Sequence, residues 1–175
     1  KMLSAKLEGS KKFTKEICEK YKIPTAKFKS FNEEILAIEY LKKQKFPIVI
    51  KADGLAAGKG VIIAKNLNEG IDAVQKNFSG AFSDAGKEII IEEFMIGEEV
   101  SFFVLADENS FTELTSDQDH KRIGINDTGP NTGGMGAYSP APIMTSKLKK
   151  ETIERIIKPT LKAMKELGCP FTGVL

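Results

Sequence analysis

Residues 48–64 read IVIKADGLAAGKGVIIA, and this stretch decides the fold that the sequence predicts. Both of its ends are rich in β-branched residues, which are typical of buried strands. The middle of the stretch is rich in glycine and contains a lysine close to the second apolar run. We therefore predict two strands joined by a glycine-rich loop.

The composition of this loop is typical of a segment that binds phosphate. Gly54, Gly58 and Gly60 would let backbone N–H groups approach phosphate oxygens, and Lys59 at the loop tip would supply positive charge. A solvated hairpin tip explains the loop alone equally well. Lys51 favours the first interpretation, because a lysine in an otherwise apolar strand is costly to bury without an anionic partner. The prediction is a lid that folds over a triphosphate.

A Walker A loop is excluded at this position. One residue too few separates Gly54 from Gly58, and Lys59 is followed by Gly60 where a serine or threonine would hold magnesium. A strand also follows the loop where a Walker A loop requires a helix.

Carboxylates stand at both ends of the connection that follows a second apolar run. Glu92 and Glu93 lie near the end of the apolar run at residues 88–94, and Glu99 follows a short turn that contains Met95. A purine could lie against such an edge, with its amine donating to a carbonyl or carboxylate and its ribose hydroxyls donating to another carboxylate. On spacing alone, the favoured alternative is that these glutamates are edge-strand charges that prevent sheets from pairing.

The polar segment 116–142 is too long for an ordinary connection, and its length suggests a functional loop. It holds two clusters that could bind a phosphate or a carboxylate through cations and backbone N–H groups. Their residues are Asp119, His120, Lys121 and Arg122, followed by Asn131, Thr132, Gly133 and Gly134. A solvated loop is the alternative. No His/Cys/Asp constellation predicts a metal site.

Periodicity and capping signals predict the elements around these motifs. Four helices are expected. One is capped by Ser10 with Phe13, Ile17 and Tyr21 inward, and one has a Ser30–Glu33 capping box with Phe31, Ile35, Ile38 and Leu41 at helical spacing. The third is capped by Asn68 with Ile71, Val74 and Phe78 inward, and the fourth is opened by Thr145 and kinked at Pro159. Further strands are expected at residues 26–28, 88–94, 100–106, 110–115 and 171–175.

Composition excludes several classes of protein. The 175 residues are 41% hydrophobic, which is enough to bury a core. The net charge of +2 is far below the excess typical of nucleic-acid binding. No membrane span or secretory signal is predicted. Cys18 and Cys169 lack a disulfide-scaffold pattern, so we expect a cytoplasmic location. The predicted strand at residues 171–175 is cut short, which suggests a fragment.

The motifs together resemble the phosphoribosylamine–glycine ligase family, whose members are ATP-grasp ligases. The resemblance rests on residues 48–61, 91–99, 116–122 and 127–140, and the run TGPNTGGMGAYSP at 128–140 is highly specific. It implies an α+β fold of ATP-grasp type. Residues 1–24 would be a helical part of the central lobe, 25–95 the small lobe with the phosphate lid, and 96–175 an incomplete central lobe.

The resemblance also assigns roles to residues. Lys51 and Lys59 would hold phosphates together with Gly54, Gly58 and Gly60. Glu92 and the backbone of Glu93 and Met95 would contact adenine, and Glu99 would hold the ribose. Lys59 and Arg122 would be the catalytic cations. The substrates would contact Asp119, His120, Lys121, Arg122, Asn131, Thr132, Gly133 and Gly134.

The family reaction joins glycine to 5-phosphoribosylamine through a glycyl phosphate, using ATP with Mg²⁺ or Mn²⁺. The resemblance finds no counterpart here for the amino-terminal domain of the family or for its magnesium-holding Glu and Asn. We therefore expect this chain alone to be inactive and to need the missing domains of its parent. The alternatives are another ATP-grasp carboxylate ligase, such as a biotin-carboxylase-like subunit, and a non-catalytic nucleotide-binding module.

Overall fold

The computed structural model describes residues 2–54, 60–81, 83–125 and 128–175. These residues form two compact units, Met2–Ile96 and Gly97–Leu175. Each unit has its own sheets and helices, and we describe each by itself.

The first unit is built on an antiparallel sheet with the strand order β1-β4-β2-β3. Its strands are β1 (Phe28–Phe31), β2 (Ile48–Ala52), β3 (Val61–Ala64) and β4 (Ile89–Glu93). The prediction that the glycine-rich loop joins two paired strands is confirmed, because β2 pairs with β3. The strand expected at residues 26–28 lies later in the chain, as β1.

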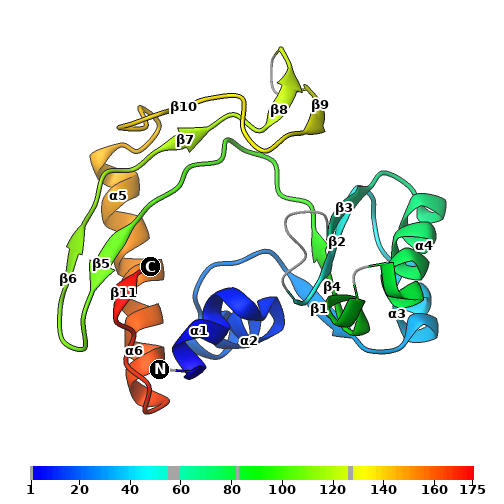
Figure 1. Ribbon diagram of the computed structural model, residues 1–175, viewed down its shortest axis with the longest axis horizontal. Coiled ribbons are helices and arrows are strands. Elements are labelled where there is room, and N and C mark those ends of the chain that lie inside the picture. Colours follow the sequence, from blue (N-terminus) through cyan, green and yellow to red (C-terminus); the bar gives the residue numbers. More distant parts are fainter. Residues whose placement is uncertain (1, 55–59, 82, 126–127) are drawn as a thin grey trace. The chain divides into compact units, whose positions relative to one another are not determined.

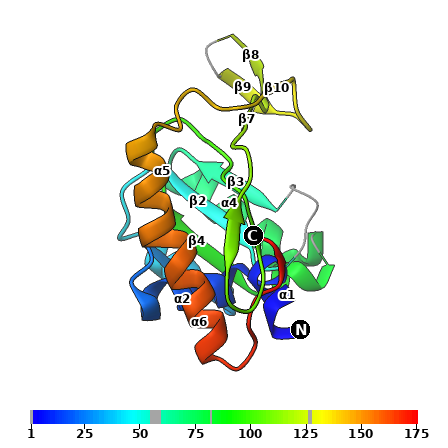
Figure 2. The same cartoon turned by 90° about the vertical axis from the view of Figure 1, so that its left-hand side faces the viewer.

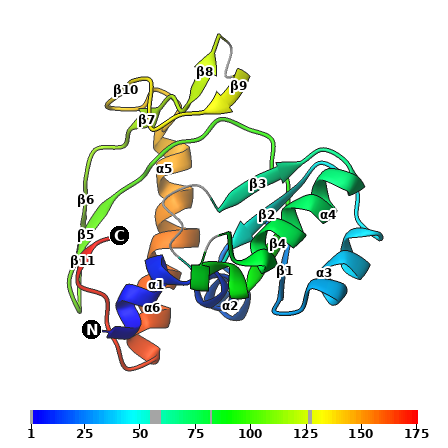
Figure 3. The same cartoon turned by 45° about the vertical axis from the view of Figure 1, so that its right-hand side comes forward.

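Alternation along β2 separates the sheet into two faces of different chemistry. Successive side chains in a strand point to opposite faces, so Ile48, Ile50 and Ala52 share one face and Lys51 lies on the other. The first face is fully covered, since these three residues are buried. A hydrophobic core fills the space between this face and the helices α3 and α4. Figures 1 and 3 show both helices along that side of the sheet.

The unit contains four α-helices and two shorter turns. They are α1 (Met2–Gly9), α2 (Lys11–Tyr21), α3 (Glu34–Leu41) and α4 (Leu67–Lys76), with η1 (Asn77–Ala81) and η2 (Ser83–Lys87) following α4. The Ser10 cap is confirmed, because its Oγ accepts a 3.1 Å hydrogen bond from the backbone N–H of Phe13.

Two predicted helix starts are wrong. Ser30 lies inside β1, and Glu33 precedes α3 without a side-chain cap, so no Ser30–Glu33 capping box forms. Pairing of β1 with β4 outweighs the local capping motif. The cap of α4 is Asn66 and not Asn68, since Asn66 Oδ1 accepts a hydrogen bond of 3.0 Å from the backbone N–H of Glu69.

The predicted inward face of α3 is partly wrong. Leu41 is fully buried and Ile38 packs against the core, as expected. Ile35, however, is 75% exposed. Because α3 starts at Glu34 and not near Ser30, Ile35 lies in the first turn, beyond the edge of the core. Phe31, predicted to lie in the same helix, is the last residue of β1.

The second unit contains short strands followed by a long helical segment. Its elements are β5 (Val104–Ala106), β6 (Phe111–Glu113), β7 (Gln118–Asp119), β8 (Arg122–Gly124), β9 (Thr128–Asn131), β10 (Ala137–Tyr138), α5 (Ser146–Thr152), η3 (Ile153–Ile157), α6 (Lys158–Glu166) and β11 (Gly173–Val174). The expected pairing of the strands around residues 100–106 and 110–115 is confirmed by the antiparallel pair β5–β6. The strand predicted at 171–175 is represented by β11, which pairs with the other edge of β5.

The helical segment starts where the sequence predicts. Thr145 caps it, with its Oγ1 accepting a 3.2 Å hydrogen bond from the backbone N–H of Leu148. The π-helical turn η3 directly precedes the turn that contains Pro159, where a kink is predicted. Proline lacks a backbone N–H, and a widened turn accommodates the missing bond. Figure 2 shows α5 and α6 as one rod beside the strands of this unit. Within the described residues, no helix is both long enough and apolar enough to cross a bilayer.

Candidate functional site

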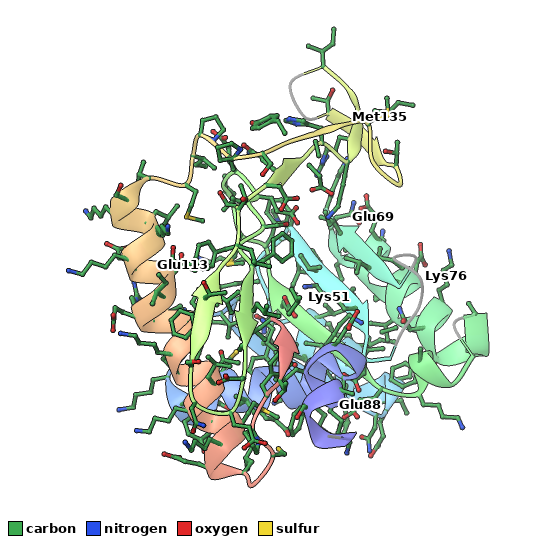
Figure 4. The ribbon with its side chains drawn as sticks, turned by 60° about the vertical axis from the view of Figure 1, so that its left-hand side comes forward. Lys51, Glu69, Lys76, Glu88, Glu113 and Met135 are labelled. Carbon is green, nitrogen blue, oxygen red and sulfur yellow. The ribbon has the colours of Figure 1, made fainter. Side chains whose placement is uncertain are left out.

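Lys51 and Glu92 form an ion pair on the face of the first unit's sheet that α3 and α4 do not cover. Lys51 Nζ lies 3.0 Å from Glu92 Oε2. In the register of β2 and β4, Lys51 is opposite Ile90 and Val49 is opposite Glu92, so the pair is diagonal on one face. Figure 4 shows Lys51 on this sheet. The anionic partner that we predicted for a lysine in this strand is therefore a carboxylate of the same unit.

Glu92 is not an edge-strand charge. β4 lies between β1 and β2, and Glu92 is only 5% exposed. A buried carboxylate is costly unless it is paired. The alternative interpretation, in which Glu92 is an edge-strand charge that prevents sheets from pairing, is therefore wrong.

A second lysine, which the sequence analysis missed, completes the pairing of Glu92. Lys15 on α2 is 9% exposed, and its Nζ lies 3.4 Å from Glu92 Oε1. The same ammonium donates to Thr25 Oγ1 at 2.7 Å and to the carbonyl of Ala26 at 3.1 Å. No local signal separates Lys15 from the solvated lysines of the same helix, because its burial depends on a strand far along the chain.

The entrance of the glycine-rich loop is tied to the start of α2. Asp53 Oδ1 accepts a hydrogen bond of 2.6 Å from the backbone N–H of Lys12, and Ser10 Oγ donates to Asp53 Oδ2 at 3.0 Å. Lys11 Nζ donates to the carbonyls of Asp53 and Gly54 at 3.3 and 3.0 Å. Lys11 is a further cation at the loop entrance that the sequence analysis missed.

The surroundings of Lys11 change its acidity. Burial lowers the pKa of Lys11, Asp53 opposes this effect, and the positive charge of Lys51 adds to it. Glu92 raises the same pKa by a smaller amount. Lys11 therefore belongs to the same electrostatic cluster as Lys51 and Glu92.

The glycine-rich loop is described at its two ends. A side chain on Gly54 would bring Cβ to 2.9 Å from Ala85 Cβ, so close packing against η2 requires glycine there. Gly60 is buried, and its carbonyl accepts a 2.9 Å hydrogen bond from the backbone N–H of Ala52. The predicted site residues Gly58 and Lys59 lie outside the described residues.

Glu93 and Met95 differ from Glu92 in their surroundings. Glu93 is exposed, and its Oε1 accepts a hydrogen bond of 2.9 Å from the backbone N–H of Lys27. Met95 is also exposed. Their side chains are therefore not part of the Lys15–Glu92–Lys51 cluster.

In the second unit, the two predicted clusters of the polar segment lie side by side. β7 pairs with β10, and β8 pairs with β9 in a register that sets Arg122 opposite Asn131. Thr132, which follows β9, is hydrogen-bonded to the residue directly before β8. Its backbone N–H and Oγ1 both donate to the carbonyl of Lys121, at 2.6 and 2.8 Å. The structure thus brings together residues 119–122 and 131–134.

Ion pairs and a ring contact link residues of this segment. Lys121 Nζ lies 3.4 Å from Glu99 Oε1 and 3.5 Å from Asp119 Oδ2. Partial burial alone would lower the pKa of Lys121, but the two carboxylates outweigh it and raise this pKa. The His120 ring lies against Tyr138 with centroids 5.2 Å apart. Gly133 and Gly134 are exposed next to these groups.

The described residues do not gather three His, Cys, Asp or Glu side chains in a metal-binding arrangement. Asp119 and Glu99 instead share Lys121 as their cationic partner. These two carboxylates therefore belong to an ion-pair cluster.

Comparison with known proteins decides the family. Residues 9–175 match the family described as phosphoribosylglycinamide synthetase, ATP-grasp (A) domain. The chain belongs to this family. It is 53% identical over 172 residues to phosphoribosylamine–glycine ligase of Brucella melitensis, and 54% identical over 173 residues to that of Escherichia coli K12. Each alignment covers 98% of this chain and 40% of the relative, so the chain spans less than half the length of these curated relatives.

Solved structures confirm the ATP-grasp fold. The crystal structure of phosphoribosylamine–glycine ligase from Thermotoga maritima matches 98% of this chain and 44% of that one, with a TM-score of 0.89 and 37% identity. Biotin carboxylase from Campylobacter jejuni matches 98% of this chain and 37% of that one, with a TM-score of 0.73 at 15% identity, and this likeness shows the fold alone. The predicted α+β fold of ATP-grasp type is confirmed.

Proposed function

We propose that the protein to which this chain belongs ligates glycine to 5-phosphoribosylamine, consuming ATP and releasing ADP and phosphate. Membership of the phosphoribosylglycinamide synthetase family supports this reaction. The observation that carries the proposal for this chain is the Lys51–Glu92 pair on the face of an ATP-grasp sheet that α3 and α4 do not cover, with Lys51 directly before the glycine-rich loop.

In this proposal the first unit binds the nucleotide. Lys51 and Lys59 hold its phosphates, with backbone N–H groups of Gly54, Gly58 and Gly60. Glu92 and the backbone of Glu93 and Met95 contact adenine. These groups lie on the face of the sheet opposite the core cluster, to which β2 contributes Ile48 and Ile50 and β4 contributes Ile89 and Ile91.

The second unit would contribute the remaining contacts. Glu99 would hold the ribose, and the paired segments 119–122 and 131–134 would hold the substrates. Their mixture of cations, hydroxyls and exposed glycine backbone suits a carboxylate or a phosphate. Arg122 would act with Lys59 as a catalytic cation.

The proposed reaction has two steps. A carboxylate oxygen of glycine attacks the γ-phosphorus of ATP, and ADP leaves. The amine of 5-phosphoribosylamine then attacks the acyl carbon, phosphate leaves, and the amine loses a proton to give glycinamide ribonucleotide. Cations that neutralise the transferring phosphoryl group would provide most of the rate. The described residues bring no metal-ligand cluster together, so we derive no step through Mg²⁺ or Mn²⁺.

We further propose that residues 25–95 are the small lobe of the ATP-grasp fold, with residues 1–24 and 96–175 contributing to the central lobe. In the structure, residues 2–24 belong to the same compact unit as the sheet of the proposed small lobe. Ligation would require the rest of the parent protein. A reducing compartment such as the cytoplasm suits Cys18 and Cys169, which lack the spacing pattern of a disulfide scaffold.

Calorimetric titration of the chain with ATP and magnesium tests the nucleotide site. Lys51→Ala is expected to lower the affinity at least about tenfold. Lys76→Ala, which removes an exposed lysine at the end of α4, is the matched control and is expected to bind like the unmodified chain. Equal affinities for all three proteins would contradict the proposed site. ADP release by the chain from ATP and glycine alone would contradict the requirement for the parent protein.

A further inference from the structure

Glu92 has two carboxylate oxygens, and each lies beside a different lysine. Lys15 Nζ lies 3.4 Å from Oε1, and Lys51 Nζ lies 3.0 Å from Oε2. The two lysines approach from separate elements, α2 and β2. A single buried carboxylate therefore has two cationic partners.

The two lysines are not equivalent. The Lys15 side chain is 11% exposed, and its ammonium has three oxygen partners, from Thr25, Ala26 and Glu92. An ammonium has three N–H donors, and Lys15 uses two of them in the hydrogen bonds to Thr25 and Ala26. It also lies over the Phe28 ring, 5.5 Å from the ring centroid. These contacts fix Lys15 in place.

Lys51 is the more accessible partner. Its side chain is 28% exposed, and the hydrogen bond described for its ammonium is the one to Glu92. A phosphate that approaches this face could therefore attract Lys51 away from Glu92. The buried Glu92 carboxylate would then lose one of its two partners, and an unpaired buried carboxylate is strongly disfavoured.

We propose that Lys15 is a positioning residue that keeps the Glu92 carboxylate charged and oriented while Lys51 moves its ammonium to a phosphate of the bound nucleotide. This inference rests on the proposed nucleotide site. Lys15 acts through Glu92 and does not itself touch the nucleotide. Lys11, whose ammonium donates to the carbonyls of Asp53 and Gly54, also interacts electrostatically with Glu92.

The proposal predicts coupling between Lys15 and Glu92. We would measure ADP affinity, with magnesium present, for the unmodified chain, Lys15→Met, Glu92→Gln and the double variant. Lys15→Met is expected to bind at least about tenfold more weakly. In the Glu92→Gln background the same substitution is expected to have little further effect, because the charge that Lys15 stabilises is already gone. Equal losses in both backgrounds would overturn the proposal.

Proton uptake gives a readout that a purely structural role would not change. Without Lys15, Glu92 would have to take up a proton when Lys51 leaves it for the phosphate. Calorimetric titrations of Lys15→Met with ADP, in buffers of different ionisation heat, should show this proton uptake. Because binding takes up a proton, the affinity of Lys15→Met for ADP should fall as pH rises. The unmodified chain should show a smaller uptake at the same pH. Identical uptake in the two proteins would contradict the proposal.

Two further variants, Lys20→Met and Lys51→Ala, separate the possible failures. Lys20→Met removes an exposed lysine from the same helix and should bind ADP normally. If Lys15→Met does not fold, the double variant is compared with Glu92→Gln, and a further loss of ADP affinity in the double variant would overturn the proposal, because both proteins lack the Glu92 carboxylate through which Lys15 acts. If Lys51→Ala binds ADP as well as the unmodified chain, the nucleotide site itself is wrong. If Lys51→Ala weakens ADP binding as expected and Lys15→Met has no effect on it, only the role of Lys15 is overturned.

Discussion

The carboxylate of Asp53 accepts a 2.6 Å hydrogen bond from the backbone N–H of Lys12. This bond joins the first residue after β2 to the first turn of α2, where backbone N–H groups lack partners within the helix. The same carboxylate accepts from the hydroxyl of Ser10, the N-cap of that helix. The entrance of the glycine-rich loop and the start of α2 are therefore one hydrogen-bonded cluster.

Asp53→Ala should lower the free energy of unfolding. The substitution leaves the N–H of Lys12 without its partner and removes a carboxylate from the positive end of a helix, which typically costs about 1–2 kcal/mol. Urea unfolding of the chain would measure the loss. Asp72→Ala, at an exposed position of α4, is the control and should change little. A loss no larger than that of the control would show that the cluster does not stabilise the chain.

Gly54→Ala should also be destabilising, because of space. The added Cβ would lie 2.9 Å from Ala85 Cβ and 3.0 Å from Ala85 Cα. Overpacking of this kind costs about 1–3 kcal/mol. Ala85→Gly in the same chain should restore part of the loss, because it removes the closer contact but leaves the backbone one. Thermal unfolding of the two single variants and the double variant measures the effect, and strictly additive losses would refute the predicted contact.

Lys11 should make stability rise with pH in the alkaline range. Its folded pKa lies below the ordinary value of 10.5, mainly because of burial. Between the two pKa values the unfolded chain binds more protons at this position, so the free energy of unfolding increases with pH. Urea unfolding from about pH 8 to about pH 10.5 should therefore show a steeper rise for the unmodified chain than for Lys11→Met. A steeper rise for the variant would give the wrong sign.

Leu41 and Ile35 provide a matched test of the position of the core. Both are aliphatic residues of α3, but Leu41 is fully buried and Ile35 is 75% exposed. Leu41→Ala should cost about 2–5 kcal/mol, through lost contacts and the cavity that remains. Ile35→Ala should change stability by less than about 0.5 kcal/mol. Similar losses for the two variants in urea unfolding would place the core differently from the structure.

Much of the fold follows from local patterns in the sequence. The β-branched runs around the glycine-rich loop predict β2 and β3, and the caps at Ser10 and Thr145 are confirmed by hydrogen bonds within one turn. These features depend on neighbours in sequence, so a local pattern is sufficient. The Asn68 cap is wrong because Asn66, two residues earlier, offers the same chemistry and also pairs with Glu69.

The other errors and omissions involve partners that are distant in the chain. Ser30 has the spacing of a helix cap, but β4 draws it into a strand. Lys15 has the pattern of a surface lysine, and only the arrival of Glu92 beside α2 gives it a buried partner. Lys51 was identified because its neighbours in β2 are apolar. A charged residue among apolar ones is visible in the sequence, whereas a charged residue among charged ones is not.

The two-faced character of β2 separates two properties that often conflict in protein engineering. Ile48, Ile50 and Ala52 face the core, whereas Lys51 faces the open side. A library randomised at the even-numbered positions of this strand would sample thermal robustness, and one randomised at the odd-numbered positions would sample ligand preference. Each could be optimised in turn on the same five-residue element.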